Sequence, residues 1–411
     1  VRERVAPILD RLAATAAHRE LARELPYAEV TELIRTGFGA LRLPAERGGG
    51  AASIRDLLGL VIDVAAADSN VAQALRAHFG IVEQLLTAGD EAQLGRILPQ
   101  VAAGAIIGNA FSEAGTGTLR THTTTVRRTE GGWVLDGEKY YSTGTLYADL
   151  VATAATIDSD TIAILDSDRV TVEYGDRVTV EYGDRVASIL IPVDRPGVEL
   201  ADDWDGFGQR LSASGATRFH GVHVADTEVL DTDLGGARRG HLIPFFQLYL
   251  AATLAGIARN VSTDVVALVN GRTRTYGHAS ADEPRHDPLV QQVVGEIASH
   301  AFAAEAIVLA AAGSLDAADS AARAGAPDDG LYTAASMTVA KAQLAVARHT
   351  LAAAQALFDA GSASATARVR NLDRHWRNAR TLASHNPLIY KPRVVGDHLL
   401  NGVGIPDGGF V

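Results

Sequence analysis

Residues 377–387 carry the side chains of this chain that are best suited to chemistry. His385 titrates near neutral pH, so its imidazole can donate an N–H and exchange a proton. Its neighbour Asn386 carries an amide, which has no basic lone pair and cannot abstract a proton. Ser142 adds a hydroxyl that can donate a hydrogen bond. A hydroxyl and an imidazole can each donate a hydrogen bond to an oxygen atom, and an imidazole can also give it a proton. The alternative for His385 is a helix-end histidine that only bonds a backbone carbonyl.

The composition predicts a soluble globular enzyme and excludes several classes of protein. The chain has 411 residues and a net charge of −12, and an acidic surface argues against a nucleic-acid partner. It contains no cysteine, so disulfides, thiolate catalysis and Cys-ligated metal sites are excluded. No uninterrupted apolar run reaches the roughly 18 residues of a membrane helix. Without a signal core at the first residues, we expect a cytoplasmic protein with no membrane partner.

No metal site is expected from the histidine spacing. His220 and His223 are three residues apart on a predicted strand, so they should face opposite sides.

The segment 168–175 is repeated without change at 176–183. The alternating residues of this repeat could form a β-hairpin extension. We favour instead a solvent-exposed insertion over the region 158–186, or an error in how this loop was recorded, and assign it no chemistry.

Three blocks follow one another along the chain. Residues 1–105 have apolar side chains at three- and four-residue spacings, which predicts helices. Residues 106–232 contain β-rich runs such as 133–141, with an Asp-Gly turn. Residues 233–411 return to long Ala-rich helical patterns. The sequence therefore predicts a multidomain α+β protein with an N-terminal helical domain, a middle β-domain and a C-terminal helical bundle.

Several motifs resemble those of acyl-CoA dehydrogenases, in the same order along the chain. They are 44–50, 109–118, 137–143, 208–212 and 272–277. In that family a run similar to 377–387 carries the catalytic glutamate, which falls on Asn386 here. The resemblance implies the same three-domain fold, a homotetramer, and a flavin near a subunit interface.

The runs 377–387 and 141–144 resemble the monooxygenase branch of that superfamily, which includes oxygenases of dibenzothiophene and indole. This resemblance implies a reduced flavin, FMN in preference to FAD, that is supplied by a separate NAD(P)H-dependent flavin reductase. The flavin would react with O2 to give a C4a-hydroperoxyflavin. One oxygen would then pass to sulfur, nitrogen or carbon of a small aromatic or heteroaromatic substrate.

The resemblance also implies roles for single residues. His385, Ser142 and Asn386 are the candidate catalytic residues, with His385 holding the distal peroxide oxygen and returning a proton. The candidate flavin contacts are Asn109, Ser112, Thr118, Thr143, Arg274 and Arg272, and Arg274 is preferred over Arg272 for the phosphate. The candidate pocket residues are His78, Trp204 and Phe246.

Each of these residues also has a structural alternative. Polar residues in the Gly-rich stretch 109–118 are common in turns, and Thr143 is an ordinary strand residue by type. An arginine can be a solvated surface residue. A histidine such as His78 can be a buried structural residue, and large aromatic residues belong to a core by default.

Three other functions stay open at this stage. A true acyl-CoA dehydrogenase could carry its base elsewhere, near Gly256, although residues 254–259 contain no carboxylate. An N-oxygenase acting on an amino sugar and an inactive flavin-binding protein are the others.

Overall fold

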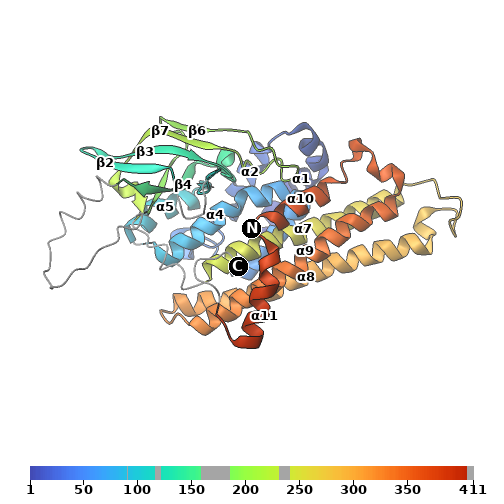
Figure 1. Ribbon diagram of the computed structural model, residues 1–411. Helices are drawn as coiled ribbons and strands as arrows, with labels where there is room; N and C mark the ends of the chain where they lie inside the picture. Colours follow the sequence, from blue (N-terminus) through green and yellow to red (C-terminus); the bar gives the residue numbers. More distant parts are fainter. Residues whose placement is uncertain (90, 116–121, 159–185, 231–240, 405–411) are drawn as a thin grey trace.

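The described chain forms two helical blocks that pack on each other and a mixed β-sheet that lies beside the first block (Figure 1). The computed structural model describes residues 1–411 except 90, 116–121, 159–185, 231–240 and 405–411. Thr118 and the repeated segment 168–183 therefore lie outside the described residues. The predicted α+β architecture is confirmed. The predicted domain boundaries stay a prediction, and the one near residue 232 lies outside the described residues.

The first block contains five α-helices: α1 Arg2–Ala22, α2 Tyr27–Leu33, α3 Ile54–Ala67, α4 Ser69–Ala88 and α5 Glu91–Ala102. Two of them have side-chain caps, because Ser53 accepts a hydrogen bond from Asp56 N and Asp68 accepts one from Asn70 N. Asp68, with φ −155°, is the single residue that separates α3 from α4. The chain therefore turns sharply there, and both helices pack on the same core. A π-helix, Ile34–Phe38, and a 3-10 helix, Ala45–Arg47, join α2 to α3.

The sheet contains β1 Ile107–Ala110, β2 Thr125–Thr129, β3 Gly132–Lys139, β4 Leu150–Ile157, β5 Val186–Pro192, β6 Val198–Leu200, β7 Thr217–Val224 and β8 Val229–Leu230. Its order is β6-β7-β3-β2-β4-β5-β8, with β1 pairing with β4. The pairs β1–β4 and β2–β4 are parallel and the others antiparallel. Short 3-10 helices lie at Thr145–Tyr147 and Asp226–Glu228.

One expectation about β7 was wrong. His220 and His223 are both exposed, because the pairing with β3 is irregular and Gly221 has φ +60°. The extra residue in β7 shifts the alternation of inward and outward side chains by one. Two residues that are three positions apart across it therefore lie on the same face of the sheet. The two histidines still bind different partners, since His220 lies near Glu199 and His223 contacts Gly131 O.

The second helical block contains α7 Leu242–Asn270, α8 Pro288–Arg323, α9 Asp329–Gly361, α10 Arg374–Ser384 and α11 Lys391–Asn401. Helices α7, α8 and α9 run alongside one another, and α11 packs on α9 (Figure 1). Four 3-10 helices join them: Pro284–His286, Ala363–Thr366, Arg368–Arg370 and Leu388–Tyr390.

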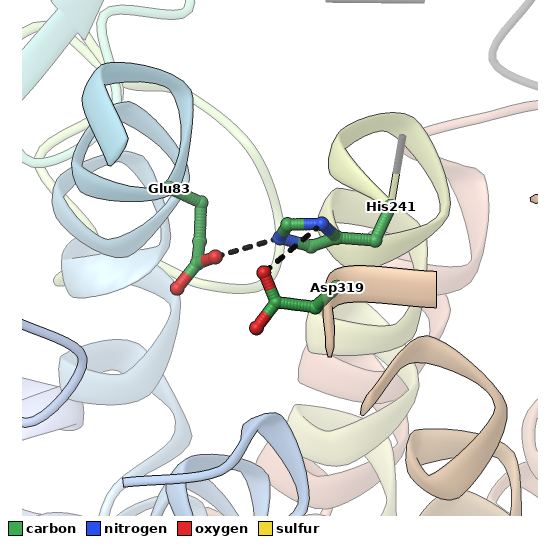
Figure 2. Close-up of side chains that lie close together, drawn as sticks. All are labelled: Glu83, His241 and Asp319. Carbon is green, nitrogen blue, oxygen red and sulfur yellow. Dashed lines mark hydrogen bonds and ion pairs between the residues drawn. The ribbon is translucent and has the colours of Figure 1, made fainter. Parts of the chain in front are cut away.

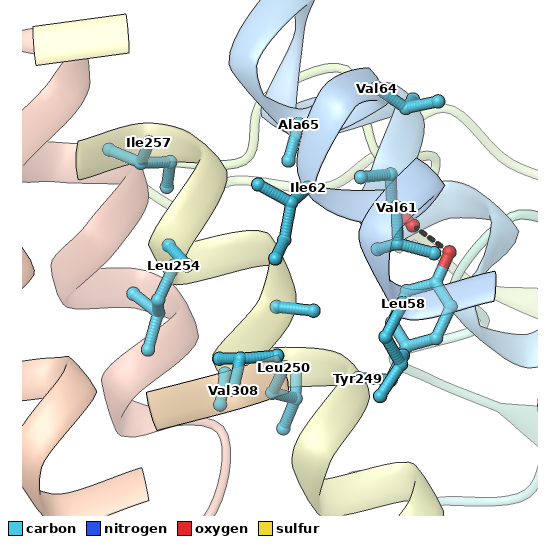
Figure 3. Close-up of a cluster of buried hydrophobic side chains, with 14 of the residues drawn as sticks. Leu58, Val61, Ile62, Val64, Ala65, Tyr249, Leu250, Leu254, Ile257 and Val308 are labelled. Atoms are coloured by element: carbon cyan, nitrogen blue, oxygen red, sulfur yellow. Dashed lines mark hydrogen bonds between the residues drawn. The ribbon is translucent and has the colours of Figure 1, made fainter. Parts of the chain in front are cut away.

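Helix α7 packs against α3 and α4 of the first block as well as against α8 and α9 of its own block. Its packing on both sides forms the main core (Figure 3). Leu254 and Ile257 on α7 belong to the same cluster as Ile62 on α3. Gly256 allows this close approach, because a Cβ built there would lie 2.4 Å from Ala65 Cβ. The hydroxyl of the buried Tyr249 donates to Ala72 O at 3.0 Å, which satisfies its polar end.

Helices α7 and α8 are long and apolar enough, by length and composition alone, to cross a membrane. In α7, 83% of the most apolar 18-residue stretch is buried inside the protein, as in the core helix of a globular fold. In α8 only 22% of the corresponding 18-residue stretch is buried. This helix therefore presents a broad Ala-rich face that the described chain leaves uncovered.

The close contact at Gly256 predicts an unusual response to a single methyl group. Gly256→Ala should lower the free energy of unfolding by about 1–3 kcal/mol, because the added methyl overlaps α3. Gly313→Ala in α8, where nothing lies within 4 Å of the new Cβ, should raise it by about 0.5–1 kcal/mol. Urea unfolding followed by circular dichroism measures both, and equal effects would contradict the predicted contact.

Candidate functional site

A chain of hydrogen bonds at the start of α7 orients the side chain of Asn386. Gln343 Nε2 donates to the backbone carbonyl of Gln247 at 3.0 Å and to Gln247 Oε1 at 2.8 Å. A carbonyl only accepts, so the amide orientations of Gln343 and Gln247 are both fixed. Asn386 Nδ2 also donates to Gln247 Oε1, at 2.9 Å. Its oxygen, Oδ1, therefore faces His385.

The same reasoning fixes the tautomer of His385. His385 Nδ1 lies 3.4 Å from Asn386 Oδ1, so Nδ1 carries the hydrogen. His385 Nε2 lies 3.3 Å from Arg76 Nη1, and a guanidinium only donates. The imidazole is thus neutral, with its lone pair toward Arg76. Although His385 is exposed, the surrounding protein and the Arg76 charge lower its pKa below the ordinary value.

Arg76 is held over an aromatic ring. Its guanidinium carbon lies 5.1 Å from the centre of the Phe246 ring, and its Nε donates to Phe246 O at 3.3 Å. Gly80, one turn further along α4, leaves room for that ring, because a Cβ at Gly80 would lie 1.9 Å from it. Burial lowers the pKa of Arg76 to about 10, so the side chain remains charged at neutral pH.

A strained turn at residues 141–144 forms the neighbouring part of the β-domain. Tyr141 has φ +63°, which costs a residue with a side chain about 1–3 kcal/mol. Ser142 is fully buried, and its Oγ has no hydrogen-bond partner among the described atoms. Thr143 Oγ1 lies 2.9 Å from Ser214 Oγ, which lies 2.8 Å from Ser212 Oγ. The turn therefore places the hydroxyl of Ser142, which has no partner among the described atoms, beside three hydroxyls that are hydrogen-bonded to one another.

Helix α4 links these two groups. A Cβ at Gly144 would lie 2.2 Å from Ala74 O, so the turn packs directly on α4 two residues before Arg76. Asn109 N on β1 lies 3.5 Å from Thr143 O. No contact joins Ser142 to His385 in the part of the chain that the structure describes. The site is thus a set of groups around α4, drawn from the β-domain, α7 and the end of α10.

Helix α10 is anchored so that His385 and Asn386 have a defined position. Asn378 Oδ1 accepts a hydrogen bond from Gln209 N at 2.6 Å, which joins α10 to the β-domain. Arg377 binds Glu20 on α1, and its Nη1 also donates to Phe207 O at 2.8 Å. Arg374 and His375 both contact Asp264 on α7. Three separate elements therefore hold the helix that ends at the site.

Two domain models of one family match the two helical blocks. The acyl-CoA dehydrogenase N-terminal domain matches residues 1–105, and the C-terminal domain matches residues 248–388. The chain belongs to the acyl-CoA dehydrogenase superfamily.

Several members of this superfamily resemble the chain over nearly its whole length. The dibenzothiophene monooxygenase of Rhodococcus qingshengii is 28% identical over 397 residues, which cover 95% of this chain and 90% of that protein. TdsC from Paenibacillus sp. A11-2, crystallised with FMN and indole, has a TM-score of 0.86 and 26% identity, with 99% and 98% of the two chains covered. The methanesulfinate monooxygenase MsuC from Pseudomonas fluorescens has a TM-score of 0.85, 26% identity and the same coverage.

The predicted flavin contacts lie in different surroundings, and their role stays a prediction. Asn109 and Ser112 are half-buried near the turn, with Ser112 O accepting Tyr140 N at 2.9 Å. Thr143 is buried and bonded to Ser214. Glu113, which no motif argument singled out, accepts a hydrogen bond from Lys139 Nζ at 2.6 Å and so joins the residue after Ser112 to the end of β3. The sequence signal that could have identified Glu113 is the pair Ser112-Glu113 within the Gly-rich run 109–118.

The structure favours the structural alternative for His78 and Arg272. His78 Nδ1 accepts from Ile107 N at 3.2 Å and Nε2 donates to Gly39 O at 2.9 Å, so both nitrogens serve the backbone. Burial lowers its pKa to about 4. Arg272 Nη1 donates to Ala360 O at 2.5 Å, close to the end of α9. Arg274 is exposed, and its contact with a flavin phosphate stays a prediction.

Two predicted aromatic residues lie at the site in different ways. Phe246 stacks under Arg76 and forms part of the site directly. Trp204 packs on the Tyr141 ring, with the ring centres 5.9 Å apart, and donates to Gly208 O at 3.2 Å. Arg76 is the site residue that the sequence argument missed, because an isolated arginine on an amphipathic helix carries no motif.

A separate cluster has the composition of a metal site (Figure 2). Glu83, His241 and Asp319 point toward one another, with His241 Nε2 2.7 Å from Glu83 Oε2. Arg42, however, binds both carboxylates and donates to Asp319 Oδ2 at 2.7 Å. The negative charges are therefore compensated by the protein, and we interpret the cluster as an ionic network that joins α4, α7 and α8.

This network predicts an acid-sensitive contribution to stability. Burial alone would raise the pKa of Glu83, but the hydrogen bond from His241 and the Arg42 charge lower it to about 2. A carboxylate with a lowered pKa stabilises the fold above pH 4.5, and this contribution is lost as the pH falls toward 2. Glu83→Gln should therefore destabilise by about 3–5 kcal/mol at pH 7, and by less at pH 3.

Urea unfolding at both pH values measures this effect. The matched control is Glu32→Gln, which removes an exposed ion pair with Arg11 and should change stability by less than about 1 kcal/mol. If Glu83→Gln is no worse than this control at pH 7, the ionic network does not stabilise the fold.

Proposed function

We propose that this chain is the oxygenase component of a two-component flavin-dependent monooxygenase. Related enzymes of the superfamily are flavin-dependent monooxygenases, and an oxidoreductase activity follows from that relationship. The observation that carries the proposal is the amide at position 386, held by Gln247 and flanked by a neutral imidazole. No carboxylate among the described contacts of Asn386 or His385 is available to remove a proton from carbon.

Reduced FMN is the proposed cofactor. TdsC has been crystallised with FMN, and this chain is similar to it over nearly the whole length. The buried, unpartnered Ser142 Oγ and the half-buried Asn109 suit a polar ring system that supplies hydrogen-bond partners. Bound there, reduced FMN would supply two electrons to O2, so that one oxygen atom enters the substrate and the other leaves as water.

Within this proposal, Arg76 is the charged donor of the site and His385 positions it. The predicted proton-returning role of His385 stays a prediction, and its lowered pKa argues against it because a neutral imidazole has little acidity. The substrate is a small sulfur-containing or heteroaromatic compound, as the names of the related enzymes suggest. A separate NAD(P)H-dependent reductase would supply the reduced flavin.

A dehydrogenase with a relocated base fits the structure less well. Position 256, where such a base was considered, faces α3 and has no room for a side chain. The nearby carboxylates of Asp63 and Glu305 are both paired with Arg259, so neither is a free base.

A homotetramer in the cytoplasm remains part of the proposal. Helix α7 has 29 residues and is therefore about 43 Å long. Phe246 is near its start and Arg274 follows its end, so one FMN cannot contact both residues of the same chain. If Arg274 binds a flavin phosphate, that flavin must belong to another subunit. The uncovered apolar face of α8 is a suitable surface for such an assembly.

Stopped-flow mixing of the reduced FMN–protein complex with O2 tests the proposed function. We expect a transient absorbance band typical of a flavin C4a adduct, and oxygenated product when a substrate is present. His385→Ala should shorten the lifetime of the band several-fold, because the ring no longer holds Arg76 and water enters the site.

The matched control is His18→Ala, which removes an exposed histidine from α1 and should leave the lifetime unchanged. An equal lifetime in His385→Ala would reject the positioning role. Bleaching of the oxidised flavin by a fatty acyl-CoA, with no adduct formed from O2, would instead support the dehydrogenase.

A further inference from the structure

Arg76 differs from the fully buried arginines of the described chain in having no acidic partner. Arg19 pairs with Asp68, Arg42 with Glu83 and Asp319, and Arg374 with Asp264. Within the described residues, no carboxylate lies at ion-pair distance from Arg76. A partly buried charge is costly unless it is paired, so an isolated guanidinium at a functional site points to a missing anion.

The contacts that Arg76 does make leave part of the guanidinium free. Nε is used by Phe246 O and Nη1 by His385 Nε2, while Nη2 has no partner among the described atoms. The side chain is only partly buried, so Nη2 can meet a ligand from solvent. The Phe246 ring and the His385 bond fix the plane of the guanidinium. Both hydrogens of Nη2 and the second hydrogen of Nη1 are left to donate to two oxygens of one anionic group.

We propose that Arg76 binds the anionic group of the substrate, so that the enzyme oxidises small sulfinates or related oxyanions in preference to neutral compounds. This inference rests on the proposed function and narrows its substrate class. Neighbouring His385 and Asn386 fit this choice because neither carries a negative charge that would repel an anion. Phe246 supplies an apolar surface for the rest of the molecule.

A phosphate of FMN could satisfy the same guanidinium, and the test separates these two sources. Binding is measured by calorimetry in the presence of oxidised FMN for two pairs of compounds. They are methanesulfinate with dimethyl sulfoxide, and benzenesulfinate with methyl phenyl sulfoxide. In each pair a charged oxygen is replaced by a methyl group of similar size. In a second arm, FMN is compared with riboflavin.

Four proteins are compared: the wild type, Arg76→Gln, Arg76→Lys and the control Arg127→Gln. Arg127 is exposed on β2 and has no ion-pair partner among the described residues. In the wild type and the control, the anion should bind about tenfold or more tightly than its neutral partner in the better-binding pair. Arg76→Gln should abolish this preference, and Arg76→Lys should keep part of it, which a purely structural role would not explain.

Three results would overturn the inference. They are that neither sulfinate binds the wild type, that the neutral compounds bind as well as the anions, or that Arg76→Gln leaves the preference unchanged. A selective loss of FMN over riboflavin in Arg76→Gln, with unchanged sulfinate binding, would assign the arginine to the cofactor phosphate. Failure of the proposed function looks different, because the protein would then form no oxygenated product while Arg76 still controlled sulfinate binding.

Discussion

The polarity of the whole site depends on one backbone carbonyl, that of Gln247. Because this oxygen can only accept, it fixes the amide of Gln343, which fixes Gln247, Asn386 and finally the tautomer of His385. At the other end of this series, the guanidinium of Arg76, which can only donate, lies next to the free lone pair of His385 Nε2. Each hydrogen bond therefore agrees with the next, and such a consistent series is rigid because no member can rotate alone.

This series is held in place by the burial of α7. The helix is packed between α3 and α4 on one side and α8 and α9 on the other, and its start carries both Phe246 and Gln247. The close contact at Gly256 sets how near α3 can approach, and α3 continues through Asp68 directly into α4. The distance between Arg76 on α4 and Phe246 on α7 is thus determined by core packing far from the site. Close-packed cores transmit such constraints well.

The fold could be predicted from the sequence because its signals are local or ordered along the chain. Helical spacing, alternating strands and the order of the motifs each required only neighbouring residues. Asn386 and His385 were found in the same way, as parts of one continuous run. Arg76 was not found, since its meaning depends on the absence of a carboxylate nearby, which only the folded chain defines. The ionic network of Glu83, His241 and Asp319 escaped for the same reason, because its members are far apart in sequence.

Irregular backbone explains the remaining difference between expectation and structure. The extra residue at Gly221 brought His220 and His223 to one face of β7, which no period-two argument can foresee. The strain at Tyr141 is of the same kind, and it was not visible in a motif that reads as a regular strand.

The amide at position 386 and the guanidinium of Arg76 are physically linked choices. A carboxylate at 386 would lie beside His385 and close to a permanent positive charge, which would lower its pKa and weaken it as a base. It would also compete for Arg76 with any anionic ligand. The neutral amide avoids both effects, because it keeps its hydrogen bond to Gln247 without neutralising the arginine. Loss of the base and the presence of an unpaired cation are therefore two parts of one arrangement, in which the charge of Arg76 is left for the ligand.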